Sequence, residues 1–182
     1  MTYLDIFIIG IGLSMDAFAV SICKGLAAGR FDLRKALIIA LWFGAFQGIM
    51  PVFGFLLGSI VSGYISRYSG IVAFILLFII GAGMIKESRE ESCGNYGADV
   101  GFKTMLAAAV ATSIDALSVG VTFSAYRMSI LRSALLIAAT TFVISAFGVR
   151  IGALFGDRYK QKAEFAGGVI LIVIGVKLLL GI

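Results

Sequence analysis

The chain alternates long apolar runs with short polar connections. Six of these runs are long enough to cross a bilayer, whose hydrocarbon core of about 30 Å needs about 20 residues of helix. A segment in lipid must satisfy its own backbone hydrogen bonds, so each run is predicted to be a helix. The chain is therefore predicted to be an all-α integral membrane protein, with spans at residues 4–27, 36–61, 69–85, 103–123, 131–155 and 163–182.

Lysine and arginine are unevenly shared among the connections between these spans. With the adjoining span ends included (Lys24, Lys103 and Arg132), the first, third and fifth connections carry four, three and three of them, whereas the second and fourth carry one and two. The positive-inside rule places the richer side in the cytoplasm and both termini outside it. The first run has no preceding basic segment and carries Asp16 at mid-depth, so we interpret it as a permanent span rather than a cleaved signal peptide.

The two halves of the chain resemble each other. Residues 14–21 (SMDAFAVS) match residues 113–120 (SIDALSVG) with Ser, Asp, Ala and Val in register, and residues 36–40 resemble residues 134–138. Each half has three predicted spans, an odd number, so the second half must enter the membrane from the opposite side. This predicts an inverted-topology repeat in one membrane domain, with residues 1–85 as the first three-helix repeat, 86–102 as a cytoplasmic linker and 103–182 as the second repeat. Secondary transporters with this architecture bind their substrate near the midplane.

Asp16 and Asp115 stand at equivalent positions inside apolar runs. An aspartate at the bilayer centre costs roughly 2.5–3.5 kcal/mol on insertion scales, so two symmetric ones indicate a functional site. Small residues one turn away on each helix would let the two helices approach closely. The two carboxylates are therefore predicted to meet and bind a divalent cation. The competing interpretation is that each aspartate makes a structural hydrogen bond or a salt bridge, with Arg150 or Lys177 as the partner.

Neutral oxygen atoms near the aspartates could complete this site. Gln47 and Ser145 are repeat counterparts, although Gln47 could equally bond a neighbouring helix, and the hydroxyls could simply bond the backbone one turn back. Oxygen ligands suit Mg²⁺, Ca²⁺ and Mn²⁺, whereas zinc and copper sites favour imidazole and thiolate. A softer ligand, Met15 or Cys23, would shift the preference toward Mn²⁺. The predicted metal ligands are Asp16, Asp115, Ser14, Ser113 and Gln47, with Met15, Thr112, Ser118 and Ser145 as secondary candidates.

The composition narrows the functional classes. The chain is 60% hydrophobic and 14% charged, and its net charge of +5 comes from basic residues in loops, which sets orientation rather than nucleic-acid binding. It has no histidine and two cysteines, Cys23 and Cys93, too few for a zinc cluster or a disulfide framework. No nucleotide-binding signature is present, and no enzyme is predicted. The acidic linker is either a solvated connection or a metal-sensing loop that uses its acids and Cys93.

Several motifs resemble those of the bacterial manganese efflux pump family (MntP). They are Ser14-Met15-Asp16-Ala17-Phe18-Ala19 with Lys24-Gly25, Phe43-Gly44 with Gln47 and Pro51, Ala111 to Ala116, and Lys162-Ala163-Glu164 with Gly167-Gly168. The resemblance covers essentially the whole chain. It implies a six-span protein of the bacterial inner membrane that exports Mn²⁺ from the cytoplasm. It also implies that Asp16 and Asp115 are central to transport, that Mn²⁺ is the substrate and that no cofactor is needed.

The leading hypothesis is a secondary exporter of Mn²⁺ in which two inverted halves rock about the aspartates, with protonation of the pair as a candidate return step. One rival is an exporter of another divalent cation or of an amino acid, for which Arg150 is the only candidate counter-charge. A second rival is a membrane thiol redox relay. Such a relay needs a cysteine in each half, whereas the counterpart of Cys23 is Thr122.

Overall fold

The computed structural model describes residues 3–65, 69–87, 93, 97–125, 129–155 and 160–180. The described residues form seven α-helices and no β-strand, in agreement with the predicted all-α class. The helices are α1 (Tyr3–Ala28), α2 (Leu33–Ile65), α3 (Ser69–Glu87), α4 (Phe102–Ala111), α5 (Ile114–Ala125), α6 (Ile130–Phe155) and α7 (Lys160–Leu180).

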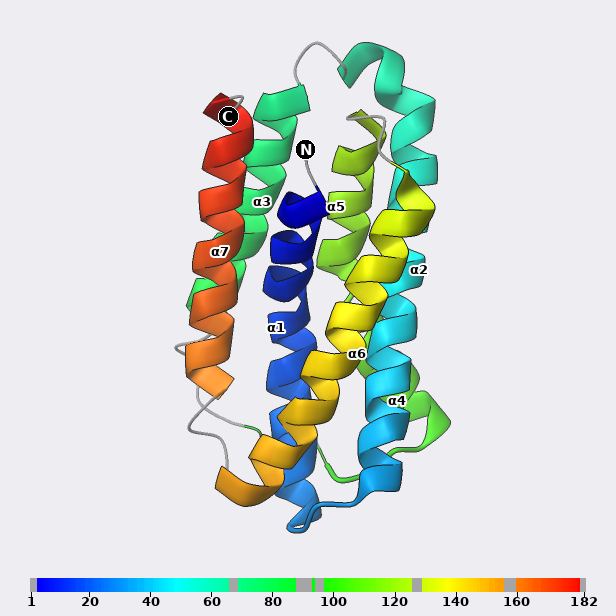
Figure 1. The fold of residues 1–182 in the computed structure, drawn as a ribbon, viewed down its shortest axis with the longest axis vertical. Coiled ribbons are helices and arrows are strands. Elements are labelled where there is room, and N and C mark those ends of the chain that lie inside the picture. Colours follow the sequence, from blue (N-terminus) through cyan, green and yellow to red (C-terminus); the bar gives the residue numbers. More distant parts are fainter. Residues whose placement is uncertain are drawn as a thin grey trace.

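The helices form an elongated bundle in which α1 is central and the two chain ends lie at the same end (Figure 1). From that end, α1, α3 and α6 run toward the opposite end of the bundle, whereas α2, α7 and the α4–α5 pair run back toward it. We call the first end the terminal end. The opposite end, where α1 finishes and α4 begins, is called the linker end.

Three helices are long and apolar enough to cross a membrane, namely Leu4–Ala28, Leu33–Ile60 and Ile130–Phe155. A bent pair, Phe102–Ala111 with Ile114–Ser124, makes a fourth if it counts as one span. Within the described residues, α3 and α7 contain shorter apolar helices, Phe74–Gly83 and Phe165–Leu180. Multiple apolar helices of this kind are the organisation of a multi-pass membrane protein.

The expectation of one continuous fourth span is wrong. The chain turns by 45° between α4 and α5, at Thr112 and Ser113. The Thr112 hydroxyl donates to the carbonyl oxygens of Ala108 (3.0 Å) and Ala109 (3.4 Å), and the Ser113 hydroxyl donates to that of Ala109 (2.6 Å). Hydroxyls that bond the preceding turn compete with the backbone ladder and bend helices. The Ser113 N–H accordingly bonds the Val110 carbonyl oxygen, three residues back instead of four.

Glycines set the distance between paired helices. A Cβ at Gly54 of α2 would overlap the carbonyl oxygen of Leu117 in α5, and a Cβ at Gly152 of α6 would overlap that of Ile22 in α1. Gly44 of α2 lies against Phe142 of α6, where a Cβ would stand 3.1 Å from the Phe142 Cβ. Helices therefore pack with their backbones close together, as small residues allow in membrane proteins. The principal pairs are α1 with α6, α2 with α5, α2 with α6 and α3 with α7.

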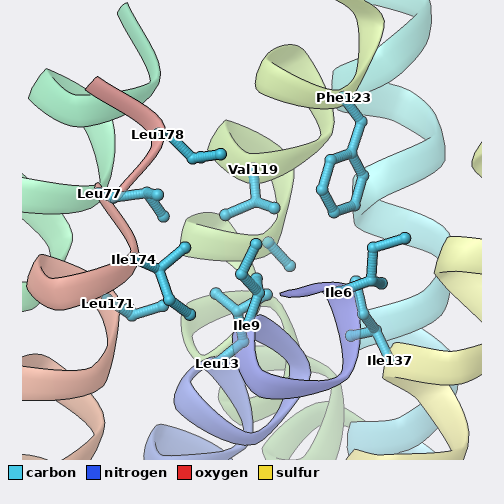
Figure 2. Packing of buried hydrophobic residues seen from close by; sticks show 11 residues of the cluster. Ile6, Ile9, Leu13, Leu77, Val119, Phe123, Ile137, Leu171, Ile174 and Leu178 are labelled. Atoms are coloured by element: carbon cyan, nitrogen blue, oxygen red, sulfur yellow. The ribbon is translucent and has the colours of Figure 1, made fainter. Parts of the chain in front are cut away.

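Two apolar clusters fill the bundle, one toward each end. The terminal-end cluster is drawn in Figure 2 and consists of Ile6, Ile9, Leu13, Leu77, Ala116, Val119, Phe123, Ile137, Leu171, Ile174 and Leu178. The linker-end cluster consists of Ala17, Val20, Ala36, Ile39, Phe43, Met105, Ala108, Ala109 and Val149. Along α1 the two clusters meet between Leu13 and Ala17, so the bundle has an internal boundary about halfway along its length.

Candidate metal site

Asp16 lies at the boundary between the two apolar clusters. On α1 it follows Met15, which packs against the terminal-end cluster, and precedes Ala17, a member of the linker-end cluster. Asp16 is half-buried in the bundle. Its carboxylate is therefore held at mid-height on the central helix, between two apolar regions that exclude water.

Asp115 occupies the matching boundary on the second half of the chain. It lies in the first turn of α5, after Ala109 of the linker-end cluster and directly before Ala116 of the terminal-end cluster. Its Oδ1 accepts a hydrogen bond from the Ala116 N–H (2.8 Å). The break in the fourth span thus places Asp115 at a helix N-terminus inside the bundle, where the unpaired N–H groups favour a negative charge.

Gln47 is fully buried on α2, and its Nε2 donates to the carbonyl oxygen of Leu13 on α1 (2.8 Å). This bond fixes the amide against the backbone three residues before Asp16. Within the described part of the chain, the Gln47 Oε1 is buried and accepts no hydrogen bond. An unsatisfied buried oxygen costs about 1–3 kcal/mol. The amide oxygen is therefore available to a ligand, while the amide nitrogen makes the bond between helices that the competing interpretation predicted.

Ser145, the counterpart of Gln47 on α6, is also buried, and its Oγ has no hydrogen-bond partner among the described residues. The two repeat-related positions therefore both carry a buried oxygen that can accept an interaction.

The other predicted ligands are mostly engaged with the backbone. Ser14 donates to the Gly10 carbonyl oxygen (2.5 Å), so its 2.8 Å bond with Thr141 of α6 is one that the Thr141 hydroxyl donates. Thr112 and Ser113 bond the preceding turn at the helix break. Each hydroxyl oxygen keeps a lone pair, so these bonds leave a ligand role open. Ser118 and Met15 are half-buried, and Met15 packs in the terminal-end cluster.

The structure also places the residues named as rivals or partners. Lys177 forms an ion pair with Asp5 near the terminal end of α1, away from Asp16. Arg150 is exposed on α6. Cys23 is joined by a disulfide to Cys93, so its sulfur is not a thiolate that could bind a metal. Thr122, at the counterpart position in the second half, donates a hydrogen bond to the Ser118 carbonyl oxygen (3.4 Å). Asp5, Thr141 and this disulfide were not predicted, although two cysteines in a chain invite the question of pairing.

The described residues contain no group of three or more His, Cys, Asp or Glu side chains that could hold a metal ion. The predicted ligand set, two carboxylates with neutral oxygens, contains no further acid, histidine or cysteine from the described residues, and oxygen ligands of this kind suit hard cations.

These features define a multi-pass helical membrane protein with acidic side chains in its interior. A family model described as "Putative manganese efflux pump" matches residues 30–179. A protein of Desulfitobacterium hafniense (strain Y51), named "Putative manganese efflux pump MntP", is 49% identical over 180 residues, covering 99% of this chain and 95% of its own. Proteins of the same name from Mannheimia succiniciproducens and Methanosphaera stadtmanae are 48% and 40% identical, covering 99% and 98% of this chain and 97% and 99% of their own.

This chain belongs to the manganese efflux pump (MntP) family, a family of transporters rather than enzymes. No solved structure matches it.

Proposed function

We propose that this protein is a secondary transporter that exports Mn²⁺ from the cytoplasm across the cell membrane. The observation that carries the proposal is the position of Asp16 and Asp115, each at the boundary between the two apolar clusters. A carboxylate at this depth is costly unless it binds something. Two aspartates can neutralise one divalent cation, and Gln47, Ser14 and Ser113 are the proposed neutral oxygen ligands.

The transport unit is proposed to be a six-span inverted repeat, in which α1–α3 correspond to α4–α7 and the α4–α5 pair counts as one span. In such a repeat α1 corresponds to α5 and α6 corresponds to α2. The α1–α6 pair of helices therefore has the α5–α2 pair as its counterpart, and both pairs are in extensive contact. Gly44 lies against Phe142, its own counterpart at an offset of 98 residues. Between α3 and α7, Gly81 lies against Gly168. At the equivalent positions of the other half, Gly175 lies against Phe74. This exchange is what a pseudo-two-fold axis in the membrane plane requires.

Alternating access follows from the same arrangement. The linker-end cluster closes the aspartates off from one side of the membrane, and the terminal-end cluster closes them off from the other. The excess of basic residues on that side predicts that the linker end faces the cytoplasm. Opening the linker-end cluster would admit Mn²⁺ to the two carboxylates, and opening the terminal-end cluster would release it outside. Protonation of the emptied carboxylates is the proposed return step, and loss of pH-gradient dependence would count against it.

The test compares Mn content and Mn tolerance in cells that lack their own manganese exporter. They express the wild-type chain, Asp16→Asn or Asp115→Asn at matched membrane levels. Asp32→Asn is the matched control, because it makes the same chemical change at the surface, where Asp32 accepts a hydrogen bond from the Arg34 N–H (2.9 Å). We expect the wild type and Asp32→Asn to lower cellular Mn, and the two interior variants to leave it high. Export that survives both interior substitutions would make the aspartates structural.

A further inference from the structure

The linker between the two halves is bonded to the end of α1 in two ways. Cys23, fully buried near the end of α1, forms a disulfide with half-buried Cys93, 70 residues later, with their Cα atoms 5.0 Å apart. Next to it, buried Lys24 donates from Nζ to the carbonyl oxygens of Asp99 (2.8 Å) and Gly97 (3.5 Å). We call this set, Cys23, Lys24, Cys93 and residues 97–101, the strap.

The strap continues directly into the second half of the chain. Asp99 accepts hydrogen bonds from the Gly101 N–H (3.0 Å) and the Thr104 hydroxyl (2.7 Å), so it is bonded to the first turn of α4. Val100 packs against the linker-end cluster, and Phe102 contacts the Trp42 ring of α2 edge-on at a centroid distance of 5.3 Å. The strap therefore joins α1, from the first half, to α4, from the second half, over the end of the cluster that separates Asp16 and Asp115 from that side.

The disulfide determines whether residues 97–101 of the strap can move away from the end of α1. Four residues of extended chain reach at most about 14 Å, so with Cys23 and Cys93 bonded, Gly97 stays close to the end of α1. The Lys24 bonds to backbone carbonyls are re-formed at once in that tethered state, because a short tether gives a high effective concentration. Without the disulfide, the links from residues 97–101 to α1 in the described part of the chain are all noncovalent: the two hydrogen bonds from Lys24 and its electrostatic attraction to Asp99. The packing of Val100 against the linker-end cluster adds to them.

We propose that Cys23 and Cys93 form a reversible redox site that regulates the exporter: the disulfide holds the linker end closed, and reduction to two thiols lets it open. This inference rests on the proposed function for its transport consequence. Basic residues place the linker end in the cytoplasm, where disulfides are rare and those that form are mostly catalytic or redox-sensing. A bond at this place is therefore suited to switching rather than to permanent stabilisation.

The reaction is thiol–disulfide exchange with a dithiol reductant. One thiolate of the reductant attacks the Cys93 sulfur, which is the more exposed of the two, and Cys23 leaves as a thiolate that takes up a proton. The second thiolate of the reductant then attacks the mixed disulfide and releases Cys93, which is also protonated. Two electrons pass to the protein, which gains two thiols, and the reductant becomes a disulfide. Exchange with a small-molecule disulfide reverses the process.

The first experiment measures Mn²⁺ uptake into inverted membrane vesicles, whose outward-facing surface is the cytoplasmic one. Wild type is compared with Cys93→Ser after treatment with a disulfide oxidant or with dithiothreitol. We expect oxidised wild type to transport severalfold more slowly than reduced wild type, and Cys93→Ser to match reduced wild type under both treatments. Equal rates for oxidised and reduced wild type, or faster transport by the oxidised form, would overturn the proposal.

The second experiment does not depend on transport. Hydrogen exchange of residues 97–104 is measured in lipid nanodiscs, and thiol alkylation reports the state of the two cysteines in growing cells and after oxidant stress. We expect faster exchange after reduction in wild type but no change in Cys93→Ser, with thiols in growing cells and a disulfide after stress. If no variant transports Mn²⁺ yet exchange follows the disulfide, the exporter proposal fails and the redox-controlled strap stands. Unchanged exchange, or a disulfide that persists in growing cells, refutes the switch.

Discussion

Replacing Gly81 by alanine should force α3 and α7 apart. A Cβ at Gly81 would lie 2.6 Å from the carbonyl oxygen of Gly168 and 2.8 Å from Cγ1 of Ile172. Real Cβ atoms essentially never approach another atom closer than 3.0 Å, and ordinary contact begins at 3.4 Å. Because a helical carbonyl group cannot rotate out of the way, the helix must move by at least 0.4 Å, the difference between 3.0 and 2.6 Å.

The size of the effect follows from two opposing contributions. Overpacking a well-packed interface typically costs about 1–3 kcal/mol. Alanine in place of glycine within a helix recovers roughly 0.5–1 kcal/mol. Gly81→Ala should therefore lower the free energy of unfolding by about 1–2 kcal/mol. At Gly83, two residues along the same helix, an added Cβ would meet no described atom within 4 Å, so Gly83→Ala should keep only the gain.

Unfolding free energies in lipid bicelles, measured by steric trapping, distinguish these outcomes. Gly168→Ala should cost about as much as Gly81→Ala, because its Cβ would lie 2.5 Å from the Gly81 carbonyl oxygen. The double variant should cost less than the sum of the two, since the helices need to separate only once. Two outcomes would refute the reasoning: Gly81→Ala as stable as Gly83→Ala, or strictly additive costs for Gly81 and Gly168.

Two further substitutions test the site and the strap. Gln47→Leu removes the buried amide oxygen and the donor to the α1 backbone, so it should abolish Mn²⁺ export, measured as the Mn content of cells. Gln47→Glu keeps an oxygen at this position and should retain more export than Gln47→Leu. The Thr104 hydroxyl and then the Gly101 N–H lower the pKa of Asp99 below its usual 3.8. The stabilisation from these two hydrogen bonds at the beginning of α4 is therefore fully present above that value and is lost as the pH falls through the lowered pKa. Amide-exchange protection of α4 followed against pH should show that step in wild type but not in Asp99→Ala.

The periodic part of the fold was readable from the sequence. Apolar runs about 20 residues long can only be helices in lipid, so each predicted span has a helix at its place. Helix boundaries depend on local bonds instead. Gly29, whose φ of +67° suits the end of a helix, follows α1. Asp32 caps α2, which begins at Leu33, three residues before the predicted start of that span.

The break between α4 and α5 was not predicted, because the hydrophobicity of the sequence does not change at that point. Residues 103–123 form a predominantly apolar run on both sides of the break, and the turn depends on which way the Thr112 and Ser113 hydroxyls point. From the sequence, the same hydroxyls are equally candidates for metal ligands and for groups bonded to the backbone. A Thr-Ser pair just before an intramembrane aspartate was the available signal, since such pairs bend helices.

The long-range contacts of the linker were also beyond sequence reasoning. Cys23 and Cys93 are 70 residues apart, and only the folded bundle brings the linker back to the end of α1. The acids Glu90 and Glu91, on which the metal-sensing alternative partly rests, lie outside the described residues. Of the remaining linker acids, Asp99 accepts hydrogen bonds from Gly101 and Thr104 at the beginning of α4, which accounts for its position without a metal.

The two halves of the bundle carry equivalent helices but unequal closures, and this inequality gives the proposed exporter one end at which it can be regulated. At the terminal end, α1 is held to α7 by the ion pair of Asp5 and Lys177, which salt and solvent can weaken because Lys177 is half-exposed. At the linker end, α1 is held to the second half by a covalent bond. A transporter that must open both ends in turn is controlled most effectively at the end where its cargo enters. In the proposed orientation, locking the cytoplasmic end would leave Mn²⁺ in the cell and the outer closure free to relax, so a single disulfide would be enough to stop net export.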